Sequence, residues 1–126
     1  MHTFLISALC LFGALCPSML SAQTNDVQAA FAGQQAQWHG FTIYTHQGRK
    51  VVLPKKAAPG KPWVLRARFW GHEPQFDIAM LNKGYHLVYC NISGLFGNPE
   101  AVARWDAFYT ELTEKHGFSN KVVLEG

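Results

Sequence analysis

The predicted architecture depends first on Tyr85-His86-Leu87-Val88-Tyr89-Cys90, an almost continuously apolar stretch. Such stretches are typical of strands buried on both faces of a parallel sheet. Apolar residues at helical spacing predict a helix on each side of it, over 74–83 and over 98–116. Further strands are expected at 63–69 and 121–124. Strands that alternate with helices of this length indicate an α/β fold with a parallel sheet.

The ends of the predicted helices carry specific signals. Gly84 follows the first helix, and Gly117 follows the second, as expected of glycine at helix C-termini. Asn98-Pro99-Glu100 offers an N-cap, a proline at the first helical position and an early acid. Before these elements, 41–45 and 50–53 are β-prone and flank a turn, which predicts a β-hairpin.

The chain of 126 residues is long enough for one small domain, which we place at 38–126. Residues 1–22 resemble a secretory signal peptide, because the apolar run 4–16 is too short to span a bilayer and Ser21-Ala22 offers a cleavage site. An uncleaved anchor is the alternative. Residues 23–37 form a polar lead-in. The mature protein is therefore expected to be secreted or periplasmic, with no stable membrane span.

Composition and failed motifs exclude several classes of protein. The net charge of +3 is modest and its basic residues are scattered, so no nucleic-acid partner is expected. Cys10 and Cys16 leave with the signal, so Cys90 alone remains and is expected to be a buried apolar residue. His72-Glu73 lacks the second histidine of a zinc-protease motif, and no phosphate-binding or dinucleotide motif is complete. We expect no metal and no cofactor.

The loop Phe69-Trp70-Gly71-His72-Glu73-Pro74 is the strongest candidate site. It joins the carboxyl end of a predicted strand to a helix, where open α/β sheets place their binding sites. Gly71 would let the backbone approach a substrate oxygen. Trp70 and His72 are candidates for substrate binding. The alternative is a tight turn in which Trp70 is merely packed.

Several stretches resemble a bacterial family of secreted α/β-hydrolases that is distantly similar to prolyl oligopeptidase-type and esterase-type enzymes. The resemblance covers 38–126, and its most specific part is Arg-Phe-Trp-Gly-His-Glu-Pro. The stretches are Pro62-Trp63, Arg66-Ala67-Arg68-Phe69-Trp70-Gly71-His72-Glu73-Pro74-Gln75, Ser93-Gly94-Leu95-Phe96-Gly97, Ala101-Val102-Ala103-Arg104-Trp105-Asp106 and Val123-Leu124-Glu125-Gly126.

The resemblance implies the N-terminal portion of an α/β-hydrolase fold, with a mostly parallel and incomplete sheet. Gly126 would open the Gly-x-Ser-x-Gly elbow, and the serine would come two residues later. The catalytic acid and histidine would follow further on, so the chain by itself would lack a triad and be inactive. Trp70 and Gly71 would donate backbone N–H groups to the oxyanion. The substrate would be a small-molecule ester, a peptide or a carbohydrate-linked compound.

A second hypothesis is a secreted, non-catalytic domain that binds sugar or peptide. Aromatic residues make up 13% of the chain, more than a short core needs. In this hypothesis an aromatic platform is formed by Trp63, Trp70, Tyr85 and Trp105. In-frame codons for x-Ser-x-Gly directly after Gly126 would favour the hydrolase, and a stop codon there would favour the binding domain.

Overall fold

A six-stranded mixed sheet forms the centre of the structure, a computed structural model that describes residues 31–126. Residues 1–30, with the expected signal at 1–22, lie outside the described part. The strand order is β1-β2-β3-β5-β4-β6. The strands are β1 (Gln34–Trp38), β2 (Phe41–His46), β3 (Arg49–Leu53), β4 (Trp63–Arg66), β5 (His86–Cys90) and β6 (Val122–Glu125).

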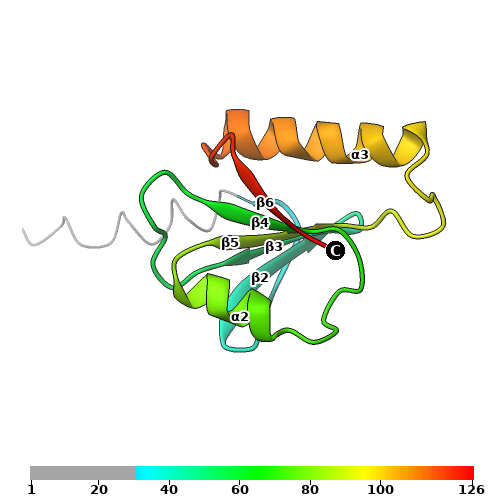
Figure 1. The fold of residues 1–126 in the computed structure, drawn as a ribbon. Helices are drawn as coiled ribbons and strands as arrows, with labels where there is room; N and C mark the ends of the chain where they lie inside the picture. The colour runs from blue at the N-terminus through cyan, green and yellow to red at the C-terminus, as the bar shows by residue number, and fades with distance from the viewer. Residues whose placement is uncertain (1–30) are drawn as a thin grey trace, which may run out of the picture.

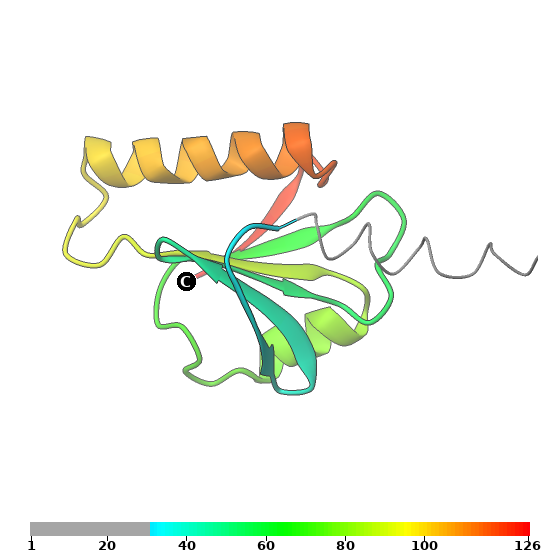
Figure 2. The same ribbon diagram turned by 180° about the vertical axis from the view of Figure 1, so that it is seen from behind.

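Two helices cover the sheet, one on each face (Figures 1 and 2). Helix α2 (Gln75–Asn82) connects β4 to β5. Helix α3 (Pro99–Thr110) continues into the π-helical turn η1 (Glu111–Lys115) and leads to β6. Neither helix is long and apolar enough to cross a membrane, and the described residues contain no other helix that is.

The expectation of a mostly parallel sheet from an incomplete α/β-hydrolase fold is wrong. The pairs β1–β2, β2–β3 and β3–β5 are antiparallel, and parallel pairing is confined to β4–β5 and β4–β6. The cause is the meander formed by the first three strands, whose two-residue connections allow only antiparallel pairing. With only two helices in the described part, the structure is a hairpin-rich mixed sheet.

The two hairpin turns explain both the meander and a strand that the sequence analysis missed. His39 and Gly40 have φ of +47° and +81°, and Gln47 and Gly48 have φ of +48° and +77°. Two successive residues with positive φ are the geometry of a type I′ turn, whose twist matches that of paired strands. The first turn pairs β1 with β2, so part of the expected polar lead-in is an exposed edge strand.

The two connections after β4 and β5 create the place for a site. The β4–α2–β5 and β5–α3–β6 connections lie on opposite faces of the sheet (Figure 1), and β5 and β6 flank β4. The chain therefore leaves the carboxyl ends of β4 and β5 in opposite directions. A crevice at this position is where open sheets with parallel strands bind ligands.

Side chains from β4 alternate between two apolar cores. Trp63 belongs to the core beneath α3, together with Val88, Phe108 and Leu112. Val64 belongs to the core against α2, which contains Val52, Leu81 and Leu87. Because alternate residues of a strand point to opposite faces, Arg66 shares the face of Val64 and extends toward α2.

His86 opens β5 and is buried without a charged partner. Its Nδ1 lies 3.3 Å from the carbonyl oxygen of Pro62, and its ring centroid lies 4.4 Å from that of Phe118. Burial, opposed by the hydrogen bond to Pro62 and aided by the positive charge of Lys61, lowers the pKa of His86 to about 4. The folded protein therefore holds His86 neutral at pH values where the unfolded chain protonates it.

Stability should fall as the pH drops from 6.5 through about 4, because over this window only the unfolded state binds a proton at His86. The full loss from this residue is about 3 kcal/mol, at roughly 1.4 kcal/mol per unit of pKa difference. Urea unfolding at several pH values measures it. His86→Gln should be less stable at pH 7 and show a flatter pH dependence, and an unchanged slope would contradict the assignment.

Candidate functional site

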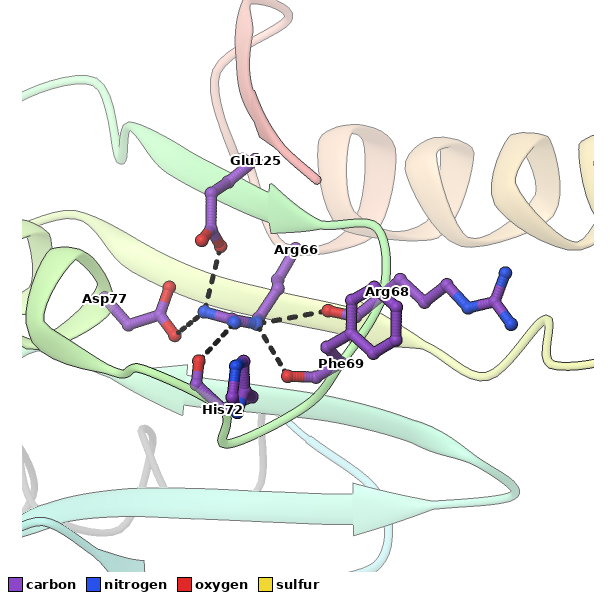
Figure 3. Close-up of polar contacts among 6 residues, drawn as sticks. All are labelled: Arg66, Arg68, Phe69, His72, Asp77 and Glu125. Carbon is purple, nitrogen blue, oxygen red and sulfur yellow. Dashed lines mark hydrogen bonds and ion pairs between the residues drawn. The ribbon is translucent and has the colours of Figure 1, made fainter.

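Arg66 lies at the carboxyl end of β4 and is the centre of a buried ionic cluster (Figure 3). Its Nη1 lies 2.5 Å from Oδ2 of Asp77 and 3.0 Å from Oε2 of Glu125. Asp77 is fully buried in the first turn of α2, and Glu125 ends β6. The one guanidinium group therefore joins β4, α2 and β6.

The same guanidinium group holds the loop 67–74 that follows β4. Nε donates to the carbonyl oxygens of Arg68 at 3.2 Å and Phe69 at 3.1 Å. Nη2 donates to the carbonyl oxygen of His72 at 2.5 Å. Figure 3 shows these contacts converging on one side chain. Arg66 thereby draws the carbonyl groups of the loop toward the protein interior.

The backbone of this loop adopts conformations that few residues tolerate. Phe69, Gly71 and Glu73 have φ of +52°, +78° and +45°. Left-handed conformations are uncommon outside glycine and persist where the surrounding structure determines them. Here the surrounding structure is the ionic cluster, which fixes three carbonyl groups of the loop.

Five backbone N–H groups of the loop, those of Arg68, Phe69, Trp70, Gly71 and Glu73, form no hydrogen bond with any described residue. His72 N–H instead donates to Phe69 O at 3.0 Å. A Cβ at Gly71 would meet no atom within 4 Å, so the space beside the backbone is open. The loop therefore presents donors that could bind the oxygen of a ligand.

Three of the candidates that the sequence analysis named, Trp70, Gly71 and His72, are consecutive residues of this loop. The Trp70 ring is partly buried, with centroids 5.1 Å from Trp38 and 5.5 Å from Tyr89, so its side chain packs and only its N–H group is available. The His72 side chain is 72% exposed, with Nε2 lying 4.0 Å from Oε1 of Glu73, whereas the backbone of His72 is held by Arg66 and by Phe69 O.

The fourth candidate, Gly126, lies beside the same loop. It follows directly after β6, and the N–H group of Ala67 donates to the backbone oxygen of Glu125 at 2.7 Å. This hydrogen bond fixes the end of β6 next to the start of the loop.

A crevice of about 140 Å³ separates this loop from the loop after β5, at the position that the two helical connections define. The sequence analysis did not identify it, because no motif marks residues that two separate loops contribute. The crevice is lined by Ala67, Arg68, Tyr89, Ile92, Ser93, Phe96 and Gly97.

The ionic cluster contains two carboxyl groups, from Asp77 and Glu125, but only one positive charge, from Arg66. Burial raises the pKa of Glu125, the nearby charge of Asp77 raises it further, and Arg66 opposes the change. Oδ1 of Asp77 is buried and has no hydrogen-bond donor within the described residues.

The four residues of the alternative aromatic platform do not lie on one surface. Trp63 and Trp105 belong to the core beneath α3, and the Nε1 of Trp63 donates to Ser119 O at 2.7 Å. Trp70 and Tyr85 pack against the core on the opposite face. The sheet therefore separates the aromatic residues into two pairs.

The described residues offer no metal centre, and no similar protein was found, that would indicate the function of this site. Residues 31–126 contain no group of three or more His, Cys, Asp or Glu side chains that could hold a metal ion. Comparison with known proteins found no matching family model, no matching curated protein and no matching solved structure. The site must therefore be interpreted from its own geometry.

Arg66→Met should destabilise the fold by about 3–5 kcal/mol, because it leaves the buried Asp77 without a counter-charge. Arg66→Lys should recover part of this loss, since an ammonium group restores the charge but not the planar set of donors. Urea unfolding at pH 7 measures both changes. Arg68→Met is the control, an exposed position where the change should stay within about 0.5 kcal/mol. Equal losses at Arg66 and Arg68 would contradict the role of the cluster.

Proposed function

We propose that this chain is the N-terminal part of a secreted serine hydrolase that acts on ester or amide bonds, and that its 67–74 loop stabilises the oxyanion. The observation that carries the proposal is the pair of unpartnered N–H groups at Trp70 and Gly71. They lie at the carboxyl end of a strand, in a loop whose carbonyl groups Arg66 holds inward.

The chemistry of acyl transfer requires such donors. When a nucleophile attacks a carbonyl carbon, negative charge develops on the oxygen, and donors already in position stabilise it without rearranging. Removing one such donor typically costs about 3–4 kcal/mol of transition-state stabilisation. A serine activated by a histidine is the nucleophile that the family resemblance implies.

The proposal uses only the parallel part of the sheet. β5, β4 and β6 run in the same direction, so their carboxyl ends meet at one edge. The resemblance assigns the nucleophile to the second residue after Gly126, and Gly126 directly follows β6. Neither Ser93 nor Ser119 lies in a Gly-x-Ser-x-Gly sequence, so the residues of this chain are assigned to oxyanion binding and not to nucleophilic attack.

Fluorophosphonate labelling tests the proposed reaction. The chain of 126 residues should remain unlabelled, whereas the product of the complete reading frame should be labelled at the second residue after Gly126. Peptide mapping by mass spectrometry locates the label. A stop codon directly after Gly126, an unlabelled complete product, or a label on Ser93 or Ser119 would each overturn the proposal.

Gly71→Val tests the oxyanion loop in the complete product. Turnover per titrated active site should fall about 10- to 1,000-fold with a smaller change in KM, because the oxyanion exists only in the transition state. Gly60→Val is the matched control, since Gly60 also has φ of +78° and open space for a Cβ but lies in a different loop. Equal effects of the two changes on turnover would remove Gly71 from the mechanism.

A further inference from the structure

We propose that the crevice between the loops after β4 and β5 binds the carboxylate group of a small acid with an aromatic or short alkyl body. This inference rests on the proposed function for its place in the reaction, but carboxylate binding itself needs no catalysis. It assigns a ligand to side chains that take no part in the proposed oxyanion binding by the N–H groups of Trp70 and Gly71.

Three residues that line the crevice carry polar side chains without a polar partner. They are Arg68, Tyr89 and Ser93, whose guanidinium and hydroxyl groups form no hydrogen bond or ion pair within residues 31–126. The guanidinium carbon of Arg68 lies 5.3 Å from the centroid of the Phe69 ring. All three groups can donate hydrogen bonds.

Among the arginines of the described part, Arg68 alone forms no ion pair. Arg49 pairs with a carboxylate at 2.7 Å, Arg66 occupies the ionic cluster, and Arg104 pairs with a carboxylate at 2.5 Å. No Asp or Glu lines the crevice, so an anion there would meet no like charge from its walls. A guanidinium group with free donors binds carboxylates in a planar, charge-assisted arrangement.

Apolar groups complete the crevice. Phe96 lines one wall of the crevice and is 86% exposed. Its backbone is left-handed, with φ of +47°. Together with Ile92 it offers an apolar surface to a ring or a short alkyl chain. Drug-sized ligands use pockets of roughly 300–1,000 Å³, so a crevice of about 140 Å³ suits an acid with a single ring.

The arrangement defines a substrate class for the proposed hydrolase. A carboxylate at Arg68 is separate from the carbonyl oxygen that the N–H groups of Trp70 and Gly71 would bind. The favoured substrates are therefore small esters or amides that carry a free carboxylate in addition to the bond that is cleaved. That carboxylate stays ionised throughout the reaction and orients the substrate.

Fluorine NMR of 4-fluorobenzoate with the chain of 126 residues tests the inference. The fluorobenzoate signal should broaden and shift with added protein, and 4-fluorobenzamide, which is neutral and of the same shape, should bind at least about tenfold more weakly. Arg68→Gln should weaken fluorobenzoate binding by about tenfold, and Arg68→Lys by less. Lys83→Gln is the charge-matched control. Lys83 lies between α2 and the amino end of β5, whereas the crevice lies at the carboxyl end of that strand.

Several results would overturn the inference. They are no binding of fluorobenzoate, equal binding of the amide, or equal effects of Arg68→Gln and Lys83→Gln. If Arg68→Gln does not fold, the combined change Tyr89→Phe and Ser93→Ala removes two donors and should also weaken binding. Fluorophosphonate labelling of the complete product is an independent measurement, so failure of carboxylate binding and failure of the hydrolase proposal can be told apart.

Discussion

The buried guanidinium of Arg66 is the group on which the rest of the site depends. A charge inside a protein is tolerated only where partners replace its hydration, and Arg66 obtains them from three directions. Asp77 supplies one carboxylate from α2, Glu125 supplies another from β6, and the loop after β4 supplies carbonyl groups. Helix, strand and loop therefore take their relative positions from one side chain.

The chemistry of the loop follows from this demand for acceptors. In a trans peptide the N–H group of the next residue points away from the carbonyl group. The inward carbonyl group of Phe69 therefore turns the N–H group of Trp70 outward, and the N–H groups of Trp70 and Gly71 have no partner among the described residues. The opposite routes of the two helical connections then open the adjoining crevice, where Arg68 lies. Arg66, which ends β4, and Arg68, two residues later in the loop, thus have different roles: Arg66 shapes the loop, and Arg68 forms no ion pair within the described residues.

Local signals in the sequence predicted the elements better than their pairing. Asn98 caps α3 as its position indicated, with Oδ1 accepting from Ala101 N–H at 3.0 Å. The strand expected over 63–69 ends at Arg66, because this residue folds the loop back on itself. β1 was missed because its glutamine-rich sequence has no apolar alternation. The candidate loop was found from its glycine and its place after a strand, but its free donors depend on acids that are distant in sequence.

The position of Glu125 has a consequence for how the site forms during synthesis. β6 follows every other described strand in the chain, so it emerges last from the ribosome among them. Domains fold as their residues are synthesised, at about 5–20 residues per second. Until β6 pairs with β4, Arg66 has Asp77 but lacks its second acid, and Ala67 lacks its acceptor. The contacts that hold the 67–74 loop are therefore complete only when the final described strand has been added, so a ribosome that pauses before this strand holds a chain in which the loop lacks part of its support.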